Sequence, residues 1–190
     1  MDGLAGGITL ISSAVLFFIA MRRQDIGSMF IITALAGSIL AFLRYNFHPA
    51  RIFMGDTGSM FLGFILSIIS ILGINKMATT VALLVPITAL GIPIYDTALA
   101  IFRRVVLGRN VMASDRKHLH YRLLDMGLTQ KQVVLFLYAV AVYFGLISFL
   151  LVLIPIEYAL LLLILLGIGV FLGMRAIGFI ETKLRATPRK

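Results

Sequence analysis

The chain has 190 residues, of which 61% are hydrophobic and 13% are charged, and it contains no Cys. A soluble domain has about 45–50% apolar and about 25% charged residues, so this composition excludes a single soluble domain and indicates a protein that lies mostly in lipid. Without Cys there are no disulfides, thiolate zinc sites or cysteine nucleophiles. The net charge of +9 favours a membrane surface, an anionic lipid or a nucleotide as partner over nucleic acid.

Apolar runs long enough to cross a bilayer recur along the whole chain. A hydrocarbon core of about 30 Å requires roughly 20 apolar residues in a helix. The sequence therefore predicts an all-α fold: one polytopic membrane domain, residues 1–190, with about six transmembrane helices. The predicted spans are residues 3–21, 26–43, 58–74, 78–102, 133–154 and 158–174. Residues 103–132 form the one long internal loop, and residues 175–190 form a basic tail.

The basic residues are distributed unevenly between the two predicted sides. The side with the N-terminus, the long loop and the tail carries 14 of the 17 Lys and Arg residues, and the other carries Arg22, Arg23 and Lys76. The positive-inside rule makes the first side cytoplasmic. Most acidic residues fall there too, and only Asp25 and Glu157 face outward. We therefore expect the chemistry at the cytoplasmic face.

A Gly-Asp-Thr-Gly-Ser turn at residues 55–59 opens the third predicted span. It combines flexible backbone and free N–H groups at a helix N-terminus with the carboxylate of Asp56. An ordinary helix cap is the alternative, because Asp, Thr and Ser are frequent N-caps. A divalent cation between Asp56 and a phosphate would explain a carboxylate beside an anion site.

Two other aspartates are candidates for function. Asp96 lies inside the fourth predicted span, and ionisable residues at membrane depth are costly and usually functional. Structural pairing of Asp96 with Arg103 or Arg104 is the alternative. Asp2 precedes the first span, where it would by itself be interpreted as a helix N-cap.

The long loop concentrates basic and imidazole side chains at Arg116, His118, His120 and Arg122. A loop lying on anionic headgroups would explain the Arg residues but not the histidines. The two histidines would point about 160° apart in a regular helix, so both contact one ligand only if the backbone departs from that helix. A two-His metal site is a weaker interpretation, because no acid lies at ligand spacing.

Three local features are also predicted. Ser114 or Asp115 caps a short helix that ends near Gly127, and Thr129 with Gln132 forms a capping box at the start of the fifth span. Close packing between helices is expected at a set of glycines in the apolar spans: Gly63, Gly73, Gly167, Gly169 and Gly173.

Four motifs occur in a fixed order: Asp-Gly-Leu-Ala-Gly-Gly at 2–7, Asn-Phe-x-Pro-Ala-x-Ile-Phe-Met-Gly-Asp-Thr-Gly-Ser-Met-Phe-Leu-Gly at 46–63, Pro-Ile-Tyr-Asp-Thr at 93–97 and Asp-x-x-His-x-His at 115–120. Together they resemble the polyprenyl-phosphate N-acetylhexosamine-1-phosphate transferases. The His-loop motif is most similar to the branch that starts wall teichoic acid, O-antigen and enterobacterial common antigen, rather than to the muramoyl-pentapeptide branch.

The resemblance implies a reaction and its partners. GlcNAc-1-phosphate would pass from a UDP-sugar to undecaprenyl phosphate, with Mg²⁺ as cofactor and Mn²⁺ as the alternative, and UMP would be released. This would start cell-wall or surface-polysaccharide synthesis at the cytoplasmic face of the inner (plasma) membrane. Phosphoryl transfer agrees with the residues, since it relies on a metal and cationic side chains to neutralise charge. The lipid bilayer is a further partner, and a homodimer is left open.

The resemblance also assigns roles to residues. Asp56 would bind Mg²⁺, and Asp2 and Asn46 would line the nucleotide and metal site. The basic loop residues would hold the diphosphate or the sugar, and Asp96 would support the site. The basic loop residues in question are Arg116, His118, His120 and Arg122.

This sequence departs from the family pattern in two ways. Tyr121 stands where the family usually has a third His. The family also has more spans than the six predicted here, and its aspartate-rich motif would lie before Met1. The chain also enters its apolar run without the basic stretch of a signal peptide. We therefore expect it to be the C-terminal part of a larger transferase and inactive alone.

Two other classes of membrane protein share some of these features. An intramembrane aspartyl protease also uses two membrane aspartates, and Tyr95-Asp96 resembles one of its motifs. However, the Gly55-Asp56 pair comes first in the chain and lacks a preceding glycine at the right spacing, and the His loop would have no role. A transporter would place ionisable groups near the midplane on broken helices, whereas here they gather at one face.

Overall fold

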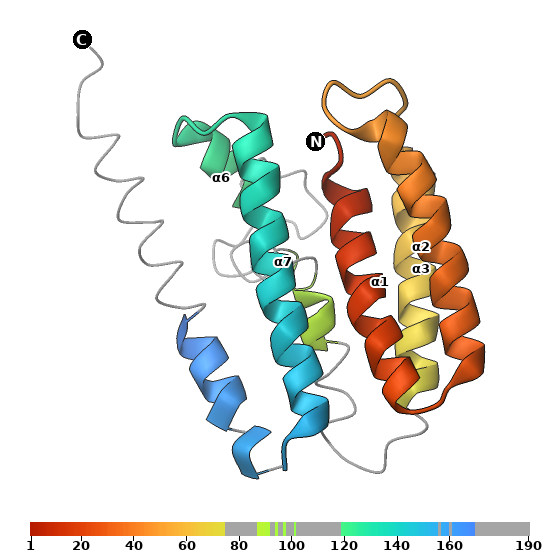
Figure 1. Cartoon of the computed structure of the whole chain (residues 1–190). Helices are drawn as coiled ribbons and strands as arrows, with labels where there is room; N and C mark the ends of the chain where they lie inside the picture. Colours follow the sequence, from red (N-terminus) through yellow and green to blue (C-terminus); the bar gives the residue numbers. More distant parts are fainter. Residues whose placement is uncertain are drawn as a thin grey trace.

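A computed structural model of the chain describes residues 1–74, 87–91, 94, 97, 101, 119–155, 157–159 and 161–169 (Figure 1). All regular structure in these residues is helical, so the predicted all-α fold is confirmed. The helices are α1 (Leu4–Arg22), α2 (Ile26–Asn46), α3 (Gly55–Ile74), α6 (Leu119–Asp125) and α7 (Gln130–Leu153).

Four helices are long and apolar enough to cross a membrane: α1, α2, the Gly55–Leu72 part of α3, and α7. They correspond to the first, second, third and fifth predicted spans. The predicted span 78–102 lies largely outside the described residues. The predicted span 158–174 overlaps a shorter apolar helix, Glu157–Gly169, and its last residues are also outside the described part. The chain is therefore a membrane-embedded helical protein.

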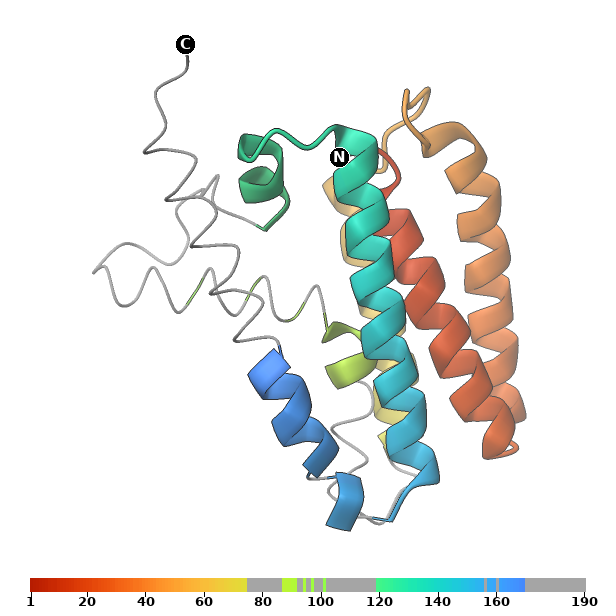
Figure 2. The ribbon, with the colours of Figure 1, turned by 60° about the vertical axis from the view of Figure 1, so that its left-hand side comes forward.

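Helix α1 is at the centre of the described bundle, between α2 and α7 (Figures 1 and 2). Of the residues in its membrane-spanning stretch, 50% are buried, whereas the buried share is 28% in α2 and 17% in α3. Small residues on α1 let its neighbours approach closely, which favours packing where no water drives helices together. The main apolar cluster joins α1, α2 and α3 and includes Leu16, Ile32, Ile39 and Leu66.

Close approaches between helices occur at glycines other than those predicted. A Cβ at Gly63, Gly167 or Gly169 would meet no atom of the described residues within 4 Å, so the described part of the chain shows no close packing at these three. At Gly6, by contrast, a Cβ would lie 2.9 Å from the Leu43 side chain, and at Gly7 it would overlap the ring of Tyr138. No packing is described at Gly73 or Gly173.

The predicted capping box at the start of α7 is confirmed. The Thr129 N–H donates to Gln132 Oε1 (2.8 Å), and the Gln132 N–H donates to Thr129 Oγ1 (3.4 Å). The preceding helix α6 ends at Asp125, and Gly127 follows with φ +92°, as the predicted short helix requires. The expected cap of that helix, Ser114 or Asp115, lies outside the described residues.

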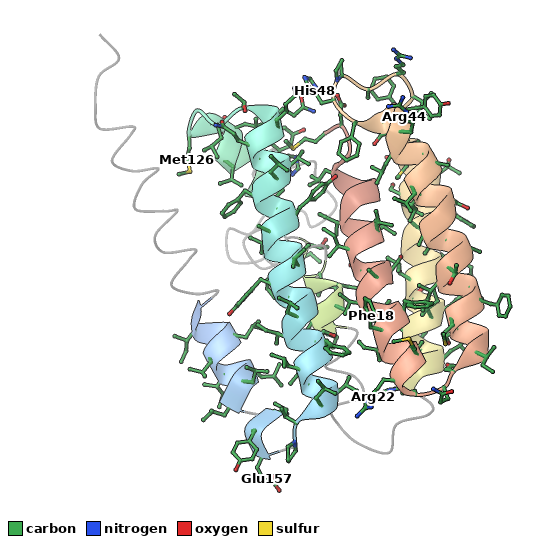
Figure 3. All side chains as sticks on the ribbon, in the orientation of Figure 1. Phe18, Arg22, Arg44, His48, Met126 and Glu157 are labelled. Atoms are coloured by element: carbon green, nitrogen blue, oxygen red, sulfur yellow. The ribbon has the colours of Figure 1, made fainter. Side chains whose placement is uncertain are left out.

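The described chain places its loops at two opposite ends of the bundle. We call the end that contains residues 1–3, 47–54 and 119–129 the loop end. His48, Arg44 and Met126 lie there, whereas Arg22 and Glu157 lie at the opposite end (Figure 3). These five residues therefore lie at the ends of the bundle to which the predicted alternation of spans assigns them.

Candidate functional site

Asp2 lies just before α1 and contacts the loop between α2 and α3. Its Oδ2 accepts a hydrogen bond from the Ala50 backbone N–H (3.3 Å) and lies 2.9 Å from His48 Nδ1. The N-cap of α1 is Gly3, and no side chain caps this helix. The interpretation of Asp2 as an N-cap is therefore wrong, because its carboxylate instead contacts His48 and Ala50 of the loop.

The contact with His48 lowers the pKa of Asp2. The hydrogen bond from His48 is the main influence and lowers the pKa of Asp2 below its usual 3.8, and the Ala50 N–H and the charge of His48 act in the same direction. Partial removal from water opposes them. The carboxylate is ionised at neutral pH, as its usual pKa already implies, and the contact extends the ionised range to lower pH.

We expect His48→Ala to make the protein less stable above about pH 4, with the difference vanishing at lower pH. A carboxyl with a lowered folded-state pKa stabilises the fold above its unfolded pKa, here 3.8, and this stabilisation is lost as the pH falls through the lowered value. Thermal unfolding in detergent across this pH range measures the effect. The control is Arg51→Ala in the same loop, and a His48→Ala deficit that persists unchanged in acid would contradict the expectation.

Asn46 is the last residue of α2 and is only 6% exposed. Its Oδ1 accepts a hydrogen bond from the Gly3 N–H (3.0 Å), and its Nδ2 donates to the Ile52 carbonyl (2.8 Å). The amide thus connects the start of α1 with the loop after α2. Through Gly3 the structure brings Asn46 and Asp2, both predicted site residues, into one cluster.

Tyr138 of α7 belongs to the same cluster, although the sequence did not single it out. Its hydroxyl donates to the Gly3 carbonyl (2.6 Å), across 135 positions of sequence. The one signal in the sequence was a tyrosine in an apolar span, because a buried tyrosine hydroxyl usually finds a partner. His48 likewise lies in the motif at 46–63, and no role was predicted for it.

Asp56 lies in the first turn of α3, directly after Gly55, whose φ of +66° favours glycine. Because α3 already begins at Gly55, Asp56 is inside the helix and is not its N-cap. The side chain is exposed, and within the described part of the chain no hydrogen bond or ion pair engages its carboxylate. A negative charge in the first turn is also favoured by the helix dipole.

The long loop contributes His120, which lies in α6 at the loop end. Its ring stacks at a tilt on Tyr121, with ring centroids 4.2 Å apart. The other predicted site residues of this region and of the fourth span, namely Asp96, Arg116 and His118, lie outside the described residues, as does the side chain of Arg122.

A metal site was predicted at Asp56. No group of three or more His, Asp or Glu side chains that could enclose a metal ion occurs among the residues that the structure describes. Mg²⁺ typically takes one or two carboxylates and completes its shell with water and substrate phosphates. A single exposed carboxylate with no described partner fits that mode of binding, so Asp56 is the candidate ligand.

The fold and the site together define a polytopic membrane protein with an acidic and amide cluster at one end of its helices. Residues 1–74 match the model of glycosyl transferase family 4. The chain is 41% identical over 145 residues to the probable undecaprenyl-phosphate N-acetylglucosaminyl 1-phosphate transferase of Bacillus subtilis, which covers 76% of this chain and 40% of that protein.

Two further relatives carry related names. Decaprenyl-phosphate N-acetylglucosaminephosphotransferase of Mycobacterium leprae is 36% identical over 168 residues, covering 78% of this chain and 42% of that protein. Phospho-N-acetylmuramoyl-pentapeptide-transferase of Moorella thermoacetica is 36% identical over 145 residues, covering 75% of this chain and 43% of that protein.

These findings support the predicted resemblance: residues 1–74 match the model of glycosyl transferase family 4, and the relatives to which the chain is similar are named as phosphosugar transferases. Asp2, Asn46 and Asp56 all lie in the matched segment. The chain spans about two fifths of the length of these curated relatives. The relatives favour the transferase over the protease and the transporter.

Proposed function

We propose that the complete protein carrying this chain transfers GlcNAc-1-phosphate from UDP-GlcNAc to undecaprenyl phosphate and releases UMP. The observation that supports this most is the cluster of Asp2 and Asn46, which lies at the same end of the bundle as Asp56 and within the segment shared with the family. The product would start the synthesis of a cell-wall or surface polysaccharide.

In the proposed reaction an oxygen of undecaprenyl phosphate forms a bond to the β-phosphorus of the UDP-sugar. The bond from that phosphorus to the oxygen shared with the α-phosphate breaks, and UMP leaves with that oxygen. Such a transfer asks the protein mainly to align the two phosphates and to neutralise their charge. No side chain needs to form a covalent bond.

Asp56 is the residue that we propose to hold Mg²⁺, with Mn²⁺ as the alternative. The bound metal would neutralise charge on the diphosphate oxygens. The exposed carboxylate of Asp56 meets no described partner that would compete for it. The basic loop side chains, Arg116, His118, His120 and Arg122, would bind the diphosphate or the sugar, and Asp96 would support the site.

Asp2 and Asn46 would line the nucleotide and metal site. The Asp2 carboxylate, whose pKa His48 lowers further, is ionised at neutral pH and can act as a hydrogen-bond acceptor. Asn46 is buried, and its Oδ1 and Nδ2 are bound to Gly3 and Ile52, so it also fixes the loop that carries His48 and Ala50. The two residues thus shape the mouth of the site.

We propose that the loop end faces the cytoplasm across the inner (plasma) membrane. Of the 17 Lys and Arg residues, 14 fall on the side of this end when the spans alternate. Basic residues are retained on the cytoplasmic side of membrane proteins. The same side would give the site access to a water-soluble UDP-sugar donor.

The proposal predicts that activity requires Mg²⁺ and the complete protein. We expect the complete protein, purified in detergent, to release UMP from UDP-GlcNAc and undecaprenyl phosphate, and chelation by EDTA to reduce the rate by at least about 100-fold until Mg²⁺ is restored. The isolated 190-residue chain should be inactive. Release of UMP by that chain alone would disprove the partial-enzyme proposal, and a complete protein without release would disprove the function.

A further inference from the structure

Tyr138 connects α7 to the residue beside Asp2. Its hydroxyl donates to the Gly3 carbonyl (2.6 Å), and the Gly7 N–H donates to the same oxygen (2.9 Å). A carbonyl oxygen has two lone pairs, so it can accept both bonds. The Gly3 N–H meanwhile donates to Asn46 (3.0 Å). Both polar groups of the Gly3 backbone are therefore held by side chains of other helices.

These bonds matter for Asp2 because Gly3 is its direct neighbour. Gly3 has a φ of +75°, and a glycine has little steric resistance to leaving such a conformation. A rotation at Gly3 would swing Asp2 away from His48 and Ala50, which hold its carboxylate. The bonds to Gly3 therefore limit a rotation that its own backbone would permit.

The ring of Tyr138 is placed for this role by its packing. It rests against Gly7, where a Cβ would overlap the ring, so only glycine lets it approach α1 this closely. A second tyrosine of the same helix, Tyr143, is 53% exposed and forms no hydrogen bond to this cluster among the described residues. Tyr138 binds the Gly3 carbonyl and Tyr143 does not, so Tyr143 is a matched control.

We propose that Tyr138 is a positioning residue, which fixes the carboxylate of Asp2 for the transfer through its hydrogen bond to the Gly3 carbonyl. The inference rests on the proposed function and adds a residue from the fifth predicted span to the site. Tyr138 itself touches neither Asp2 nor the reacting atoms in this arrangement. Its contribution is to orient Asp2.

The test uses Tyr138→Phe in the complete protein, because this change keeps the ring against Gly7 and removes the hydroxyl alone. We expect kcat for UMP release to fall about tenfold, as for the loss of one hydrogen bond, and Tyr143→Phe to change it less than about twofold. Hydrogen exchange of the amides in residues 3–9 should become faster in Tyr138→Phe and not in Tyr143→Phe.

The same change in an Asp2→Asn background separates positioning from general support of the fold. If Tyr138 acts through the Asp2 carboxylate, adding Tyr138→Phe to Asp2→Asn should lower kcat by less than about a further twofold. An equal loss in both backgrounds, or a Tyr138→Phe enzyme as active as Tyr143→Phe, overturns the inference while the proposed function stands. A complete wild-type protein that releases no UMP overturns the proposed function and this inference with it.

Discussion

Asp56→Asn should reduce the release of UMP by the complete protein by at least about 100-fold. The substitution keeps the size of the side chain but removes the negative charge of the residue proposed to hold Mg²⁺. Asp56 is exposed in the first turn of α3, and its carboxylate has no partner in the described part of the chain, so folding should not change. The rate is measured with UDP-GlcNAc and undecaprenyl phosphate at saturating Mg²⁺.

Asp125→Asn is the matched control for this loss. Asp125 is also an exposed aspartate at the loop end, at the last position of α6, and no role is proposed for it. Its substitution should change the rate less than about twofold, within the range of surface changes. Retention of more than about a tenth of the activity by Asp56→Asn would remove Asp56 from the proposed metal site.

The largest expected effect on stability comes from Gly7→Ala. A Cβ at position 7 would overlap the ring of Tyr138, and both residues lie in the tightly packed contact of α1 with α7. Overpacking of this kind costs about 1–3 kcal/mol. The variant should unfold at a lower temperature in detergent and lose the hydrogen bond from Tyr138 to Gly3, with a corresponding loss of activity.

Gly37→Ala is the control, because a Cβ there would meet no described atom within 4 Å. It should be neutral or slightly stabilising, since Ala favours a helix more than Gly does. The double variant Tyr138→Ala/Gly7→Ala should lose less stability than the sum of the losses in the two single variants. The shortened side chain at position 138 leaves room for the methyl group at position 7. A Gly7→Ala protein as stable as wild type would contradict the packing of α7 on α1.

The elements of the fold that depend on local sequence were predictable. A run of about 20 apolar residues is sufficient to indicate a membrane helix, and four of the predicted spans are present as helices of that kind. The capping box of Thr129 and Gln132 was also predictable, because its two partners are three residues apart.

Which faces pack together could not be predicted. Spans that are apolar on all sides carry no stripe that distinguishes protein from lipid, because both neighbours are equally apolar. The predicted packing glycines therefore included Gly63 and Gly167, whereas the close contacts among the described residues include those at Gly6 and Gly7 of the central helix.

The sequence predicted the motif residues of the site but not the contacts that hold them in place. Motifs selected Asp2, Asn46 and Asp56, which the structure places at one end of the bundle. They could not reveal that His48 binds Asp2 or that Tyr138 binds Gly3, because each contact joins distant parts of the chain. For the same reason Asp2 was open to interpretation as a cap.

The central claim is that the sugar moves together with its phosphate. The most direct measurement gives the complete protein UDP-GlcNAc that carries a radiolabel in the β-phosphate, together with undecaprenyl phosphate and Mg²⁺. We predict that the label enters the lipid fraction and that the nucleotide released is unlabelled UMP. Label that remains in water as UDP, or that appears as inorganic phosphate, would contradict the claim.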